Sequence, residues 1–188
     1  MSRAYTIIVP LFHTLSPLRS HCTQGVAIVK AAILTVSDSR RERDDTSGAA
    51  IREILETHGF EVSGYEVIPD DRAQIGARIQ SWADGGEVGL IVTTGGTGLG
   101  LRDVTPDATR DIMEYEVPGI AEAMRAEGLK HTPMAMIGRG VAGVRSGTLV
   151  INLPGSEKGV RESLAVVAPV LRHALELLAG GSSDHGVG

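Results

Sequence analysis

A glycine-rich stretch in the middle of the chain, TTGGTGLGLRDVTPDAT, occupies residues 93–109. Glycine weakens any helix or strand that contains it, so a cluster of this density needs a local reason. Backbone N–H groups with no Cβ in front of them can approach an anion closely, and Thr105-Pro106 is typical of a helix start, whose positive end favours phosphate. The stretch matches neither a P-loop nor a dinucleotide fingerprint. We predict a phosphate-binding loop, with a plain flexible turn as the alternative.

An aspartate inside this stretch, Asp103, indicates a metal. A carboxylate beside bound phosphates repels them unless a divalent cation lies between, and Mg²⁺ is held in proteins by one or two carboxylates plus substrate phosphates. Asp70 follows another predicted strand and is the candidate for the second carboxylate, with a helix cap as its alternative role. Asp71 competes for either role. Asp38 and Asp45 are weaker candidates, because polar residues after a strand usually cap or solvate a loop.

Other candidates follow strand ends in the same way. Ser156 opens a long helix and is expected to be its N-cap, yet the N–H groups there can also hold a phosphate. No Ser/His or Cys/His pair stands out, which favours phosphoryl chemistry, in which positioning and charge neutralisation do most of the catalysis. The predicted nucleotide- or phosphate-binding residues are Ser37, Asp38, Gly95, Gly96, Thr97, Gly98, Thr105, Pro154, Gly155 and Ser156.

The elements that must position these residues alternate between strand-like and helix-like periods. Apolar or alternating runs predict strands over 31–36, 61–68, 88–92, 134–137, 141–145 and 148–152. Helices are expected after Thr46, from Arg72, from Thr105, as a short one from Pro118, and from Ser156 to Leu178 with a kink or break at Pro169. This alternation predicts a three-layer α/β/α domain with a mainly parallel sheet, whose strand ends gather the candidate loops at one edge.

Composition narrows the class of protein. The 188 residues carry a formal net charge of −5, which argues against a general nucleic-acid binder. The single cysteine, Cys22, excludes a disulfide framework and fits a reducing cytoplasm. No run approaches the roughly 18 apolar residues of a membrane span. We expect one domain over 31–179, a weakly ordered extension over 1–30 and a disordered tail over 180–188.

Several ordered motifs resemble one known family. The sequence is similar to the molybdopterin adenylyltransferases of the MoaB/Mog family, which includes the G domain of gephyrin, over about Ala31 to Leu178. The motifs that carry this resemblance are Leu34-Thr-Val-Ser-Asp38, Asp45-Thr-Ser-Gly48, Thr93-Thr-Gly-Gly-Thr-Gly98, Arg102-Asp-Val-Thr-Pro106, Pro118-Gly119 and Leu153-Pro-Gly-Ser156. One departure is Gly138-Arg139, where the family often has Ser-Arg, so that a hydroxyl contact to the pterin is expected to be lost.

The resemblance implies a homotrimer of molybdenum cofactor biosynthesis that adenylylates molybdopterin with Mg-ATP and releases pyrophosphate. Asp70 and Asp103 match the two carboxylates that the family needs, and they would hold the Mg²⁺. A transient contact with a molybdenum-insertion protein follows from the same role. The alternatives are a pterin-binding carrier or assembly protein without transferase activity, and a related domain of molybdenum insertion or nucleotide-pyrophosphate hydrolysis.

Overall fold

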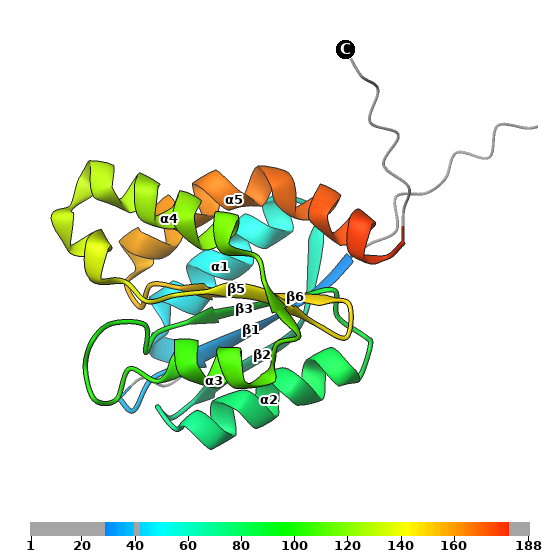
Figure 1. The fold of residues 1–188 in the computed structure, drawn as a ribbon, viewed down its shortest axis with the longest axis horizontal. Helices are drawn as coiled ribbons and strands as arrows, with labels where there is room; N and C mark the ends of the chain where they lie inside the picture. Colours follow the sequence, from blue (N-terminus) through cyan, green and yellow to red (C-terminus); the bar gives the residue numbers. More distant parts are fainter. Residues whose placement is uncertain (1–28, 40–41, 181–188) are drawn as a thin grey trace, which may run out of the picture.

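The computed structural model describes residues 29–39 and 42–180, and the expectations for residues 1–28 and 181–188 lie outside these described residues. One six-stranded sheet runs through the described part in the order β2-β1-β3-β6-β5-β4 (Figure 1). Its strands are β1 (Val29–Val36), β2 (Phe60–Ile68), β3 (Leu90–Thr94), β4 (Tyr115–Glu116), β5 (Ala142–Arg145) and β6 (Thr148–Leu153). The first four strands of this order are mutually parallel, while β5 is antiparallel to both of its neighbours. The predicted mainly parallel sheet is confirmed.

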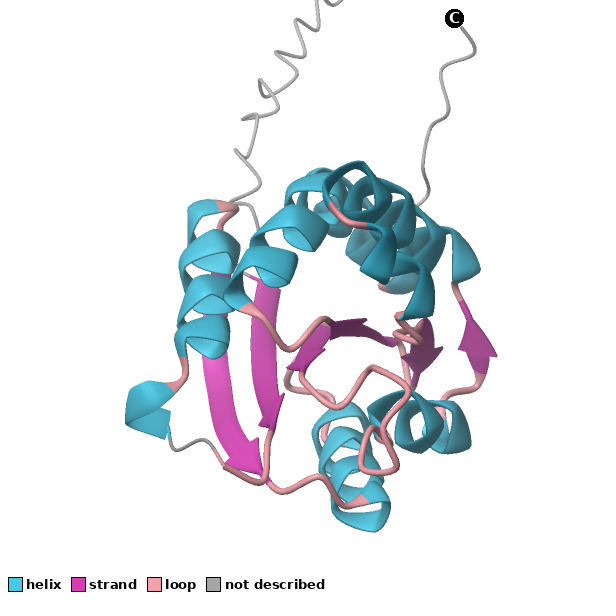
Figure 2. Ribbon diagram, turned by 90° about the vertical axis from the view of Figure 1, so that its left-hand side faces the viewer, coloured by secondary structure: helices cyan, strands magenta, loops and turns pink. Residues whose placement is uncertain are grey.

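Helices cover both faces of the sheet, as Figure 2 shows, which confirms the predicted three layers. One face carries α1 (Thr46–Thr57), α4 (Pro118–His131) and α5 (Glu157–Leu178). The other face carries α2 (Arg72–Asp84) and α3 (Thr105–Ile112). Two short 3₁₀ helices, η1 (Glu42–Asp44) and η2 (Pro133–Ile137), lie in the connections. Of the described helices, none is long and apolar enough to cross a membrane.

Strand β1 shows how the sequence builds the two cores. Ala31 and Ile33 belong to the apolar cluster under α1, α4 and α5, whereas Ala32 and Leu34 belong to the cluster under α2 and α3. All four are completely buried. Successive side chains of a strand point to opposite faces, so a run that is apolar at every position can be covered only between two helical layers.

The carboxyl ends of the parallel strands lie level with one another. Val36 pairs with Ile68 at the ends of β1 and β2, and Thr94 pairs with Leu153 at the ends of β3 and β6. The chain leaves β1 toward β2 on one side and reaches β3 on the other, so the strand order reverses between β1 and β3. Ligands of open α/β sheets bind beyond the strand ends at such a reversal.

The opposite edge of the sheet holds both ends of the domain. Strand β1 starts and α5 ends at the side of the molecule away from the glycine-rich loop (Figure 1). Gly89 lies next to both, because a Cβ built on it would be 3.2 Å from Val29 Cγ1 and 3.9 Å from Leu175 Cδ2.

Three expectations about individual elements are corrected. Residues 134–137 form the 3₁₀ helix η2 instead of a strand, because Pro133 lacks an N–H for strand pairing and the Thr132 side chain accepts from Met134 N–H. The helix at Pro118 has 14 residues and is not short. Of the kink or break expected at Pro169, the break does not occur, because α5 is continuous through this residue; Ala165, whose carbonyl loses its donor there, is exposed to solvent.

Candidate active site

The glycine-rich loop begins after β3 with two residues whose backbone conformation favours glycine. Gly95 has a φ of +95° and Gly96 a φ of +59°, a region that disfavours side chains. A Cβ on Gly95 would lie 2.1 Å from the carbonyl oxygen of Val36. A Cβ on Gly96 would lie 2.8 Å from a carboxylate oxygen of Asp70. These two glycines therefore bring the loop backbone against the ends of β1 and β2.

Asp70 and Asp38 lock the ends of β1 and β2 together. Asp38 N–H donates to Asp70 Oδ2 at 2.9 Å, and Asp70 N–H donates to Asp38 Oδ1 at 3.1 Å. Arg102, from the glycine-rich loop, forms a two-pronged ion pair with Asp38 at 3.0 and 2.8 Å. Hydrogen bonds from Arg102 and from the Asp70 backbone lower the pKa of Asp38. Asp38, a weak candidate from sequence, thus anchors the loop.

The two predicted metal ligands lie close enough for the charge of Asp103 to act on Asp70. Burial raises the pKa of Asp70, and the negative charges of Asp38 and Asp103 add to this. Asp103 is half-buried and its Oδ2 accepts from Gly100 N–H at 2.7 Å, which closes a tight turn in the loop. The helix cap belongs to Asp71, which accepts from Gln74 N–H at 2.9 Å, so Asp70 is left for another role.

The hydroxyl of Thr105 is buried and lies near the carboxylate of Asp70. The residue is fully buried, and among the described residues its Oγ1 has no hydrogen-bond partner. The position that a Cβ on Gly96 would occupy lies 2.6 Å from Thr105 Oγ1 and 2.8 Å from Asp70 Oδ1. A side chain would therefore fill the small space that both oxygens border, and the glycine keeps that space open.

Arg139 fastens the glycine-rich loop from the other side. Its guanidinium donates to the carbonyl oxygen of Gly98 at 2.7 Å, to the carbonyl oxygen of Asp103, and to Asp107 at 3.1 Å. Its backbone N–H donates to the carbonyl oxygen of Thr97 at 2.9 Å. Arg139 therefore holds the loop in place, and its positive charge is paired with groups of the protein itself.

The turn after β6, residues 154–156, packs directly against the glycine-rich loop. A Cβ on Gly155 would lie only 3.2 Å from Gly95 Cα, so the two segments are in close contact at these glycines. Thr94 Oγ1 donates to the carbonyl oxygen of Pro154 at 2.7 Å. Ser156 is the N-cap of α5, as predicted, and accepts from Gly159 N–H at 3.1 Å.

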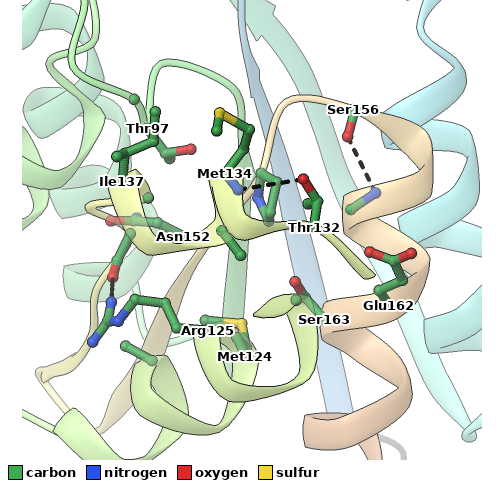
Figure 3. Close-up of a pocket in the computed structure, with 18 of the residues that line it drawn as sticks. Thr97, Met124, Arg125, Thr132, Met134, Ile137, Asn152, Ser156, Glu162 and Ser163 are labelled. Carbon is green, nitrogen blue, oxygen red and sulfur yellow. Dashed lines mark hydrogen bonds between the residues drawn. The ribbon is translucent and has the colours of Figure 1, made fainter. Parts of the chain in front are cut away.

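A cavity of about 310 Å³ opens on the far side of this loop, between α4, η2 and α5 (Figure 3). Its walls are apolar in large part, with Met124, Met134 and Ile137 among them. The other residues that line it are Thr97, Gly98, Ala121, Arg125, Gly128, Thr132, Ala135, Gly138, Gly140, Asn152, Pro154, Ser156, Lys158, Gly159, Glu162 and Ser163. The volume is within the range of small-molecule sites.

The predicted site residues thus fall on two sides of one loop. Thr97, Gly98, Pro154 and Ser156 border the cavity. The carboxylate side holds the others, namely Ser37, Asp38, Asp70, Gly95, Gly96, Asp103 and Thr105, with Gly155 at the contact between the two segments. Within the described residues, no three acidic, histidine or cysteine side chains form a metal site by themselves.

Sequence reasoning missed the residues that α4 and η2 contribute to the cavity. Met124 and Arg125 lie inside a helix that the sequence predicted to be short, and Met134 lies in a segment assigned to a strand. Glu162 belongs to the long α5, where nothing in the local pattern distinguishes it from a solvated glutamate. Only the packing of α4 on α5 brings these side chains together.

Comparisons with known proteins show the family of the chain. The family model described as a probable molybdopterin binding domain matches residues 32–173. A molybdopterin adenylyltransferase of Helicobacter pylori is 38% identical over 156 residues, which cover 81% of this chain and 89% of that protein. The crystal structure of the molybdopterin biosynthesis enzyme MoaB from Thermus thermophilus is 55% identical with a TM-score of 0.76, covering 81% of this chain and 98% of that one.

A longer relative contains the same unit. The molybdenum cofactor synthesis protein cinnamon of Drosophila melanogaster is 38% identical over 149 residues, which are 78% of this chain but only 25% of that protein. The family match covers most of the described domain, including β1, the glycine-rich loop and the turn after β6. The chain therefore belongs to the molybdopterin-binding domain family of molybdenum cofactor biosynthesis, together with the MoaB and Mog proteins.

Proposed function

We propose that this protein is a molybdopterin adenylyltransferase. The terminal phosphate oxygen of molybdopterin would attack the α-phosphorus of ATP, the bond from that phosphorus to the bridging oxygen would break, and pyrophosphate would leave. The observation that carries the proposal is that one glycine-rich loop separates a carboxylate cluster from a cavity of small-molecule size. Two substrates that each end in phosphate can then meet at the loop between them.

The residues at the carboxylate cluster fit a magnesium ion. Asp70 and Asp103 supply carboxylate oxygens, and the buried Thr105 hydroxyl without a protein partner adds a neutral oxygen beside Asp70. Mg²⁺ prefers oxygen ligands and usually keeps substrate phosphates among them, so two carboxylates suffice. When bound there, the ion supplies charge neutralisation for the phosphates of both substrates.

The protein's own part in this reaction is positioning. Arg139 and the Asp38–Arg102 pair fix the glycine-rich loop at both sides, so that its N–H groups keep their place while charge develops on the transferred phosphate. Fixed donors of this kind stabilise a transition state without reorganisation during the reaction. No side-chain nucleophile is needed, because the pterin phosphate is itself the attacking group.

The test is an adenylylation assay with purified protein, molybdopterin, ATP and Mg²⁺, following pyrophosphate release and adenylylated pterin. Asp103→Asn removes the charge and keeps an oxygen that accepts from Gly100 N–H. We expect turnover to fall about 100-fold or more, as for other lost electrostatic contacts in active sites. Asp111→Asn is the matched control, because Asp111 pairs with Arg72 on the surface, and it should retain full turnover.

Full activity of Asp103→Asn would contradict the assignment of this carboxylate. Tight binding of molybdopterin by the unaltered protein without any product, beside an active relative as positive control, would instead support a carrier or assembly role. The homotrimer and the contact with a molybdenum-insertion protein stay predictions from the resemblance, and the cytoplasmic location stays a prediction from the single cysteine.

A further inference from the structure

The cavity beside the glycine-rich loop has one acidic residue in its lining, Glu162 of α5. Its side chain is only 17% exposed, and it faces a space whose other walls include the side chains of Met124 and Met134 (Figure 3). A carboxylate seldom lies this deep in an apolar surface unless something compensates its charge. The contacts of Glu162 therefore need to be accounted for.

The protein compensates this carboxylate only partly. Among the described residues, two basic side chains lie close to it, with His131 Nδ1 at 3.6 Å and Lys158 Nζ at 3.7 Å, both farther than a hydrogen bond reaches. The side chain of Lys158 is 77% exposed, so solvent screens that pair. Arg125, which also lines the cavity, donates to the carbonyl oxygen of Gly140 at 3.1 Å. Glu162 thus keeps acceptor capacity for a ligand.

We propose that Glu162 binds the aminopyrimidinone edge of the pterin ring and so makes the cavity the pterin side of the site; this rests on the proposed function. That edge presents two parallel donors, the 2-amino group and the ring N3–H, which match the two oxygens of a carboxylate. Adenine presents its amino group beside an unprotonated ring nitrogen, whose lone pair a carboxylate repels. The cavity therefore discriminates in favour of the pterin.

The placement of the two substrates follows. Thr97 and Gly98 line the same cavity as Glu162, so a pterin held at Glu162 has its phosphate-bearing end directed toward the glycine-rich loop. The nucleotide then occupies the other side of the loop, where Asp38, Asp70 and Arg102 lie. Glu162 is a specificity residue in this arrangement and takes no part in the transfer of the adenylyl group.

The experiment compares equilibrium binding of molybdopterin and of ATP, each alone, to the unaltered protein and to Glu162→Gln. Glutamine has the same size but offers one acceptor and an N–H₂ group that opposes the pterin donors. We expect molybdopterin to bind about 10- to 100-fold more weakly, the effect of losing hydrogen bonds to a charged group, and ATP to bind unchanged. His131→Gln is the matched control, since it removes the neighbouring imidazole and leaves the carboxylate, and it should bind both as before.

Competition by two ring compounds tests the recognised edge. In the unaltered protein, 6-hydroxymethylpterin should displace molybdopterin better than 6-hydroxymethyllumazine, in which an oxo group replaces the 2-amino group. Glu162→Gln should lose this preference. Unchanged molybdopterin binding in Glu162→Gln, or weaker ATP binding instead, would overturn the inference, as would failure of the unaltered protein to bind molybdopterin.

The two proposals fail in different ways. If Glu162→Gln adenylylates molybdopterin with an unchanged KM for the pterin, the proposed function stands and the role of Glu162 is refuted. If the pterin preference depends on Glu162 but no adenylylated product forms, the cavity is assigned and the transferase activity is refuted.

Discussion

Replacing Thr105 with valine is expected to stabilise the free protein while it impairs the enzyme. Thr105 is fully buried, and its hydroxyl has no hydrogen-bond partner among the described residues. A buried polar group left unpaired costs about 1–3 kcal/mol, and valine has nearly the same shape without the hydroxyl. For a domain of this size 1 kcal/mol corresponds to about 2–4 °C, so a gain of about 1–3 kcal/mol should raise the melting temperature by roughly 2–12 °C.

Activity should change in the opposite direction. If the hydroxyl is a ligand of the magnesium ion or of a phosphate, Thr105→Val should lower kcat/KM about 10- to 100-fold, the value of one hydrogen bond to a charged group. Thermal denaturation without ligands and the adenylylation assay are run on the same preparations. Thr105→Ser keeps the hydroxyl and should retain most of the activity. A valine variant that melts at a lower temperature, or one that is fully active, would refute the reasoning.

Two further predictions concern stability. Gly48→Ala should destabilise the domain by about 1–3 kcal/mol in urea unfolding, because its Cβ would lie 2.3 Å from Asp45 Oδ2 and 2.7 Å from Tyr65 Cε2. The control Gly119→Ala should not destabilise it, because a Cβ there has nothing within 4 Å. Equal stability of the two variants would count against the close packing around Gly48. Asp70→Asn should be more stable than the unaltered protein at pH 7, because burial raises the pKa of the Asp70 carboxyl. The carboxyl therefore contributes favourably to the free energy of unfolding below its ordinary pKa of 3.8, and this contribution is lost as the pH rises through the folded-state pKa. The gain should therefore shrink as urea titrations approach pH 3.8, and a gain that grows toward acid pH would reverse the assigned sign.

The apolar pattern within the strands and the glycines that follow helices indicated most of the fold. The uninterrupted apolar run of β1 required two covering layers, and the glycine at position 59, with φ +79°, ends α1 as its position suggests. The pattern of residues 134–137 was misleading, because a short apolar segment has no period that separates a strand from a 3₁₀ turn. The neighbouring Pro133 and the Thr132 side chain, which accepts from Met134 N–H, favour the turn.

The candidate site divides in the same way. Which of Asp70 and Asp71 caps α2 depends on the direction of each side chain, and a sequence does not contain it; the structure gives the cap to Asp71. Asp45, a weak candidate, is a buried N-cap that also accepts from Tyr65 at 2.7 Å, so its role is structural. Glu162 could not be identified, because its environment is created by α4, some forty residues earlier in the chain.

The position of the two domain ends has a consequence for protein architecture. Val29 and Leu175 both lie next to Gly89, at the end of the sheet that faces away from the glycine-rich loop. A partner domain joined through either end would start on the side of the molecule away from the glycine-rich loop and would leave that loop uncovered. This arrangement makes the fold suitable for fusion to other domains at either end. Relatives in which the matched unit is a quarter of a longer polypeptide, such as the Drosophila protein, are consistent with that use.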